Sequence, residues 1–208
     1  MATNYKAFVP FILRWEGGVS NDKADSGGLT NKGITFTTYK ALARGVLKKE
    51  PTQSNFLAMT ERDAELIIKF FWDKATNKNG INSQKIAEAV TSWFWGSGGV
   101  GIRNFQRLLN KEFGTSLSID GVVGNQTVAV INRINEHKLF IKMIEARKQF
   151  FIDLADKRPK DKRFLKGWLN RLNDFYNRHK RDSDPSIKLV GVVLGMTLAL
   201  FFLKNITG

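Results

Sequence analysis

Two carboxylates near the start of the chain have surroundings that suit catalysis. Glu16 follows Trp15 and precedes Gly17-Gly18, and Asp25 comes nine residues later in a glycine-rich loop. An apolar neighbour raises the pKa of a carboxyl group, which keeps it protonated as a general acid must be. A hairpin in the loop would bring Asp25 across a cleft from Glu16, the two-carboxylate arrangement of glycoside hydrolysis. The alternatives are a solvated surface glutamate and an aspartate that makes Asx-turn hydrogen bonds.

Composition excludes several other kinds of chemistry. The 208 residues include no cysteine and only two histidines, His137 and His179. A thiol nucleophile, a disulfide scaffold and a thiolate zinc site are therefore excluded, and a histidine-rich metal site is not expected. We expect no metal and no cofactor, so any catalysis must use carboxylates, hydroxyls, amides or lysine.

The charge of the chain indicates a polyanionic partner. Thirty-three Lys and Arg stand against 19 Asp and Glu, a formal net charge of +14, and residues 157–181 hold much of the excess. Nucleic acid, anionic lipid headgroups and an anionic cell-wall polymer all fit this charge. Because no nucleic-acid motif is present, we expect no nucleic-acid partner.

The elements that must position these residues are mostly helices. Apolar residues recur at helical spacing in six stretches, and Thr60 and Ser83 are expected to cap two of them. Pro10 should begin or kink the first helix. A glycine break at 96–99 should separate two helices, and residues 120–124 should form a turn before the helix at Thr127. The six stretches are 8–15, 60–71, 83–93, 105–113, 141–154 and 165–176. The pattern predicts a mainly α fold with a small β-hairpin after the first helix.

The two ends of the chain differ in character. The first 18 residues lack the basic start and continuous apolar stretch of a signal peptide. Residues 187–204 form a hydrophobic segment whose two charged residues are Lys188 and Lys204. We expect this segment to be a membrane helix, although it is short for a span of roughly 17 to 25 residues and a shallow or partner-buried helix is the alternative. The basic residues before it would leave the main domain in the cytoplasm; insertion from outside remains open.

The first motif resembles a known family of enzymes. ILRWEGGVSNDKADSGGLTNKGIT is similar to the signature of glycoside hydrolase family 108, N-acetylmuramidases also called secretion activator proteins. The family pattern is Glu-Gly-Gly, then Asp-x-Gly-Gly, which ends here at Gly28, then Thr-x-x-Gly-Ile-Thr. The resemblance implies a lysozyme-like helical domain with Glu16 as the catalytic acid. The order Glu, Asp, Thr also looks like the catalytic loop of phage-type lysozymes, which implies that Asp25 and Thr30 position water. The interval from Asp25 to Thr30 is one residue shorter here.

A second region continues the resemblance. IAEAVTSWFWGSGGVGIRNFQRLLN and IDGVVGNQTVAVIN are similar to the predicted peptidoglycan domain of the family, with its Gln-Arg-x-Leu and Asp-Gly-x-x-Gly-x-x-Thr elements. The resemblance covers most of residues 5–175. It divides a domain of residues 1–182 into a catalytic part, 1–95, and a peptidoglycan-binding part, 96–176. The family often has an aspartate where this chain has Ser92, so a third carboxylate is not expected.

The resemblance implies a peptidoglycan hydrolase that cleaves the β-1,4 bond between N-acetylmuramic acid and N-acetylglucosamine. Carboxyl groups roughly 6.5–9.5 Å apart would predict inversion, and a separation near 5 Å would predict retention. Gly28 and four aromatic residues are candidates for substrate binding, although a core position is an equal alternative for each ring: Trp15, Tyr39, Trp93 and Trp95.

The expected setting is a bacterial or phage-encoded enzyme of host lysis or cell-wall remodelling. It would be monomeric in its soluble domain and associated with the bacterial membrane through residues 187–204. The main alternative is a non-catalytic peptidoglycan-binding or secretion-associated protein. A nucleic-acid binder, suggested by charge alone, ranks third.

Overall fold

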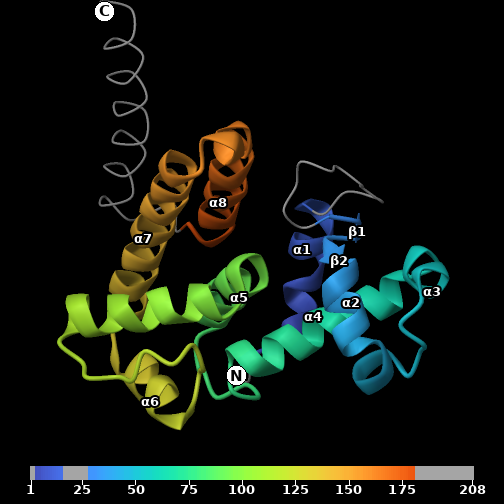
Figure 1. The fold of residues 1–208 in the computed structure, drawn as a ribbon. Helices are drawn as coiled ribbons and strands as arrows, with labels where there is room; N and C mark the ends of the chain where they lie inside the picture. The colour runs from blue at the N-terminus through green and yellow to red at the C-terminus, as the bar shows by residue number, and fades with distance from the viewer. Residues whose placement is uncertain (1–2, 16–27, 181–208) are drawn as a thin grey trace, which may run out of the picture. The chain divides into compact units, whose positions relative to one another are not determined.

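The computed structural model describes residues 3–15 and 28–180, which divide between two units. The first unit ends at Leu165 and the second begins at Lys166. The first unit begins with a 3-10 turn, η1 (Tyr5–Ala7), and helix α1 (Val9–Trp15), and it ends with the 3-10 turn η3 (Pro159–Phe164). Helix α8 (Leu165–His179) makes up most of the described part of the second unit. The predicted mainly helical fold is confirmed (Figure 1).

Between these ends the first unit contains one small hairpin and a succession of helices. The strands are β1 (Thr30–Asn31) and β2 (Ile34–Thr35). The remaining elements are α2 (Phe36–Leu42), the π-helical turn η2 (Ala43–Leu47), α3 (Gln53–Leu57), α4 (Glu61–Ala75), α5 (Gln84–Phe113), α6 (Asn125–Arg133) and α7 (Glu136–Lys157).

The predicted hairpin after the first helix is confirmed. β1 and β2 are antiparallel, with Thr30 opposite Thr35 and Asn31 opposite Ile34. Lys32 and Gly33 both have positive φ, 50° and 73°. Two consecutive residues with positive φ are what the common two-residue hairpin turn requires, and glycine meets that requirement without steric cost. Gly33 therefore favours the turn that joins the two strands of this hairpin.

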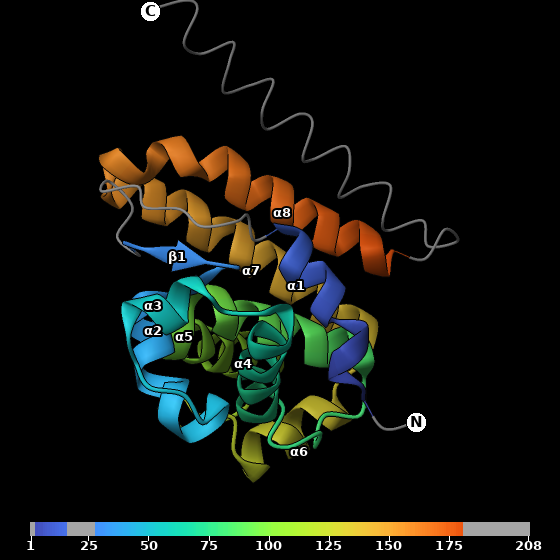
Figure 2. The same ribbon diagram turned by 90° about the vertical axis from the view of Figure 1, so that its right-hand side faces the viewer.

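A hydrophobic cluster holds the hairpin against the neighbouring helices. Phe56 and Tyr39 are fully buried, and their rings meet edge to face with centroids 5.3 Å apart. Figure 2 shows the hairpin beside α2 and α3. The buried members of the cluster come from β2, α2, η2, α3 and α4: Ile34, Tyr39, Ala43, Leu47, Phe56, Met59, Ala64 and Ile67. Burial of so much apolar surface is the main stabilising contribution in this half of the unit.

Helix α5 runs through the glycines that were expected to separate two helices. Instead of a break, Gly98 forms a kink inside the element, with φ 53° and ψ −146°. Gly101, one turn later, lies so close to the first half of the helix that a Cβ there would meet the Trp93 carbonyl oxygen at 2.6 Å. A side chain larger than hydrogen cannot occupy position 101 without movement of the backbone.

Helix α7 crosses α5 instead of running along it (Figure 1). Near the first half of α5, Nη1 of the buried Arg147 donates to Ser92 Oγ at 3.0 Å. Near its end, Lys142 Nζ lies 3.3 Å from a carboxylate oxygen of Glu112. Contacts on both sides of the kink therefore join α5 to α7.

No helix in the described ranges is both long enough and apolar enough to cross a bilayer. The predicted membrane segment, 187–204, lies outside the described residues.

Candidate active site

The two predicted carboxylates lie outside the described residues, and the structure describes what flanks them. Glu16 directly follows Trp15, the last residue of α1. Asp25 precedes Gly28, where the described chain resumes. Trp15 is partly exposed. The predicted roles of Glu16 and Asp25 therefore stay predictions.

Thr30, the third predicted catalytic residue, lies in the first strand of the hairpin. Its hydroxyl donates to the Gly28 carbonyl oxygen at 3.1 Å, and the side chain is partly buried. Gly28 has φ +63°, and a Cβ there would meet nothing within 4 Å, so backbone conformation and not space favours glycine. Because a hydroxyl has one hydrogen and two lone pairs, Thr30 can still accept a hydrogen bond from water.

Asn31 holds the hairpin in place, and sequence reasoning did not identify it. The side chain is buried, and its Nδ2 donates to the carbonyl oxygens of Phe56 at 2.9 Å and Leu57 at 3.3 Å. These carbonyls belong to the end of α3, and the Phe56 oxygen also accepts from the Met59 backbone N–H at 3.2 Å. Thr30 is therefore fixed through its neighbour to an element 25 residues away. The one sequence signal is an amide side chain inside a strand that flanks the predicted site.

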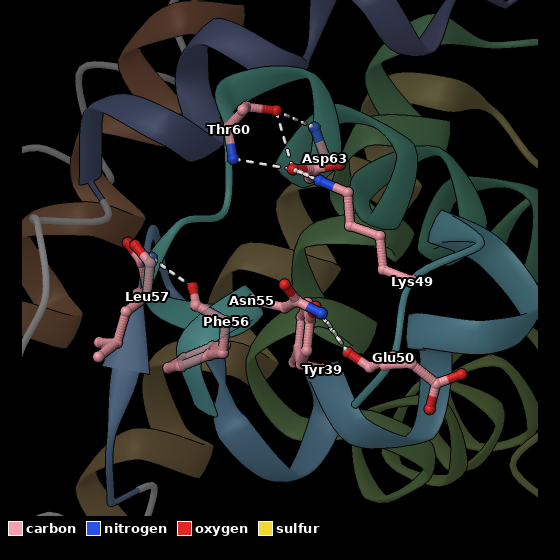
Figure 3. Close-up of polar contacts among 9 residues, drawn as sticks. Tyr39, Lys49, Glu50, Asn55, Phe56, Leu57, Thr60 and Asp63 are labelled. Atoms are coloured by element: carbon pink, nitrogen blue, oxygen red, sulfur yellow. Dashed lines mark hydrogen bonds and ion pairs between the residues drawn. The ribbon is translucent and has the colours of Figure 1, made fainter. Parts of the chain in front are cut away.

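An ion pair between the buried Asp63 and the more exposed Lys49 lies at the start of α4 (Figure 3). Asp63 Oδ2 accepts hydrogen bonds from Lys49 Nζ at 2.7 Å, from Thr60 N at 2.8 Å and from Thr60 Oγ1 at 2.9 Å. The Asp63 backbone N–H donates back to Thr60 Oγ1, which completes the predicted capping box. These contacts join the turn after η2 to the first turn of α4.

The charge state of Asp63 follows from these contacts. Burial raises the pKa of the carboxyl group, but the hydrogen bonds from Lys49 and Thr60 outweigh burial, and the pKa is lowered. The carboxylate therefore stays ionised at neutral pH, and its Oδ2 accepts from three structural donors. Asp63 is unsuited to the role of general acid.

Two of the predicted substrate-binding rings are buried. Tyr39 has no exposed surface, and its hydroxyl donates to the Glu50 carbonyl oxygen at 3.4 Å. Burial raises the pKa of Tyr39. Trp93 is 1% exposed and packs against Phe105. In this conformation neither ring presents a face to solvent.

Trp95 is the more accessible of the tryptophans on α5. It is partly exposed and meets the ring of Phe71 edge to face, with centroids 5.0 Å apart. Trp15, Gly28 and Trp95 are thus the partly exposed members of the predicted binding set. Their binding roles, like that of Thr30, remain predictions.

Two buried polar residues on α5 were not identified from the sequence as parts of a site. Glu88 is 1% exposed, and one of its carboxylate oxygens accepts from Gln84 Nε2 at 2.7 Å. Ser92 is also buried and receives the Arg147 guanidinium. Glu88 could have been noticed as a charged residue inside an apolar helical stripe. No group of His, Asp and Glu in the described ranges could hold a metal ion.

Comparisons with known proteins divide the chain close to the kink at Gly98. Residues 9–98 match the family model of glycosyl hydrolase 108, and residues 100–173 match a predicted peptidoglycan domain. SagA from Brucella abortus has a solved structure that aligns with 86% of this chain and 97% of its own, at 22% identity and a TM-score of 0.69, which shows a shared fold. No curated protein matches the sequence. Residues 9–98 of the chain are therefore similar to glycosyl hydrolase 108, and the residues after them are similar to a predicted peptidoglycan domain.

Proposed function

We propose that this chain is a lysozyme-like N-acetylmuramidase that cleaves the glycan strands of peptidoglycan. The observation that carries the proposal is the glycosyl hydrolase 108 match over residues 9–98, a range that contains the Glu-Gly-Gly motif directly after α1. The peptidoglycan domain over residues 100–173 supports the same substrate.

In this proposal Glu16 protonates the glycosidic oxygen while positive charge develops on the sugar ring. Glu16 directly follows Trp15 in the sequence, and an apolar neighbour favours the protonated form of a carboxyl group that a general acid needs.

Asp25 is the proposed base that activates water, with Thr30 as its helper. The hydrogen bond from Thr30 to the Gly28 carbonyl uses the hydroxyl hydrogen, so the oxygen lone pairs are oriented to accept from water. Asn31 fixes the strand that carries Thr30. The water would attack the sugar carbon as the leaving oxygen takes the proton from Glu16.

The test is release of sugars from purified peptidoglycan by the full chain and by a Glu16→Gln variant. The control is Glu61→Gln, which makes the same change at an exposed residue in the first turn of α4. We expect the wild type and the Glu61 variant to release products with reducing N-acetylmuramic acid ends, identified by mass spectrometry after borohydride reduction. The Glu16 variant should lose about 10²-fold or more in rate. Activity that survives the Glu16 change would contradict the assignment, and wall binding without cleavage by any form would favour a non-catalytic binding protein.

The proposed location depends on the sequence of the C-terminal segment. We propose that residues 187–204 associate with a membrane, which is supported by their nearly continuous apolar sequence. A reporter active outside the cytoplasm, fused to the C-terminus, tests this topology. Activity of the reporter would show that the C-terminus crosses the membrane, and recovery of the full chain free of membranes would contradict the association.

A further inference from the structure

A groove in the first unit lies at the crossing of α5 and α7. Its volume is about 730 Å³, within the range of sites that bind small molecules. Apart from Trp93, every residue that lines it lies in the part of the chain that matches the peptidoglycan domain. The groove is thus separate from the hairpin that carries Thr30.

The floor of the groove is aliphatic more than aromatic. Leu108, Ala146 and Leu154 line it together with the partly buried Phe150. Trp93 also contributes, but it is 1% exposed. A sugar ring is usually recognised by an exposed aromatic face, and this floor offers little of one. Methyl groups of short amino-acid side chains fit such a floor better.

The charges around the groove differ between its two walls. On the α5 wall, Arg107 and Lys111 are exposed and one helical turn apart. Arg107 donates to the Asn104 side chain at 2.9 Å, and neither cation has an ion-pair partner in the described part of the chain. A ligand carboxylate could therefore reach two uncompensated positive charges.

The α7 wall carries charges of both signs, since Glu145 and Asp153 line it together with Lys142 and the exposed Lys157. Asp153 is exposed and accepts a hydrogen bond from Gln149 Nε2 at 2.7 Å. Lys142 is already paired with Glu112 at 3.3 Å and Glu145 at 3.2 Å. Asp153 is thus the lining carboxylate whose charge is available to a ligand cation.

We propose that this groove binds the peptide stem of peptidoglycan and not its glycan strand. The stem is a short peptide that carries carboxylates, alanine methyl groups and, at its diamino acid, a free ammonium group. The carboxylates would meet Arg107 and Lys111, the methyl groups the aliphatic floor, and the ammonium group Asp153. The inference rests on the proposed function because it takes peptidoglycan as the partner.

The probe is the free tetrapeptide L-Ala-D-Glu-meso-diaminopimelyl-D-Ala, titrated into the full chain by calorimetry. The variant Arg107→Glu/Lys111→Glu should weaken binding by about tenfold or more, because hydrogen bonds to charged groups are lost and repulsion replaces them. Arg133→Glu is the control, an exposed cation in the last turn of α6 and outside the groove. It should bind as the wild type does.

A second variant tests the opposite wall. Asp153→Asn should weaken binding of the tetrapeptide but leave unchanged the binding of a tetrapeptide whose side-chain amine is acetylated. The exposed positions of Arg107, Lys111 and Asp153 predict that the variants fold as the wild type does, which thermal unfolding checks. Equal loss for both peptides would overturn the assignment of the ammonium group to Asp153.

Three results would overturn the groove assignment itself. These are no binding of the tetrapeptide by the wild type, binding that is unchanged in the charge-reversed variant, and binding of the peptide-free disaccharide with the same dependence on Arg107. Cleavage of peptide-free glycan strands separates this inference from the proposed function. Sugar release without peptide binding would contradict only the proposal that the groove binds the peptide stem. Peptide binding without sugar release would contradict only the proposal that the chain hydrolyses the glycan strand.

Discussion

The ion pair between Asp63 and Lys49 at the start of α4 gives the most specific prediction for stability. Asp63 accepts three hydrogen bonds on one carboxylate oxygen, and its side chain is 8% exposed. The variant Asp63→Asn keeps the size of the side chain but removes its charge, so Lys49 loses its partner. Hydrogen bonds to charged groups contribute about 1.5–3 kcal/mol, and loss of a helix cap costs about 1 kcal/mol.

We expect Asp63→Asn to lower the free energy of unfolding by about 2 kcal/mol, because an asparagine oxygen can still accept one of the three bonds. For a chain of this size that corresponds to a fall in Tm of roughly 4–8 °C. The measurement is urea and thermal unfolding followed by far-UV circular dichroism. The matched control is Glu50→Gln, which breaks the ion pair between Arg44 and Glu50, whose side chains are 73% and 65% exposed. This exposed pair should give a far smaller change.

The pH dependence has a definite sign. Because the pKa of Asp63 is lowered in the folded state, its stabilising contribution is fully present above the unfolded pKa of about 3.9. The contribution is lost as the pH falls through the lower folded pKa. The difference in stability between wild type and Asp63→Asn should therefore shrink below about pH 4. A difference that is the same at pH 7 and pH 3, or a loss at pH 7 no greater than that of Glu50→Gln, would refute the reasoning.

Three further tests concern the buried tryptophans, the close approach at Gly101 and the hairpin that carries Thr30. Trp72 and Trp93 are both buried, but Trp72 Nε1 donates at 2.6 Å whereas Trp93 Nε1 has no acceptor in the described ranges. In urea unfolding, Trp72→Phe should therefore cost about 1–2 kcal/mol more than Trp93→Phe, and equal costs would contradict this. Gly101→Ala should lower Tm because of the close Trp93 carbonyl, whereas Gly96→Ala in the same helix, with open space around it, should raise Tm or leave it unchanged. A rise in both would disprove the close approach. Asn31→Ala should lower Tm and the rate of peptidoglycan cleavage together, and unchanged values of both would show that the hairpin does not need this side chain.

Local interactions explain which parts of the fold were predictable. The side chains of Thr60 and Ser83 accept from backbone N–H groups three residues later, as their sequence contexts predict. At the turn of the hairpin, Gly33 adopts its positive φ without steric cost, whereas the positive φ of Lys32 is not indicated by its residue type. In a helix with one apolar face, apolar residues recur about every 3.6 residues along the sequence. The approximate ranges of such helices can therefore be predicted from the sequence.

Contacts between distant residues were not predictable in the same way. The hydrogen bond from Asn31 to Phe56 joins residues 25 apart, and that from Arg147 to Ser92 joins residues 55 apart. The continuation of α5 through its glycines also depends on packing, because Gly98 alone leaves the helical region and the chain resumes its course. No local pattern in the sequence encodes these choices.

The candidate site shows the same division. Motif spacing predicts Glu16, Asp25 and Thr30 as site residues, whereas the hydrogen bonds by which Gly28 and Asn31 hold Thr30 and its strand are visible only in the structure. Tyr39 and Trp93 illustrate why residue type is a weak guide, since a large ring fits a core and a sugar site equally well.

The kinked helix α5 has a consequence for how the two matched regions work together. The boundary between them, residues 98–100, falls inside this helix and not in a linker. A helix of this length extends for about 45 Å, and its kink confines the change of direction to one residue. In the proposed function, a wall component held by the second region would therefore be joined to the first by a continuous helix and not by a linker. The two regions then lose their orientational freedom relative to each other when the chain folds. Binding of the substrate would not have to order them a second time.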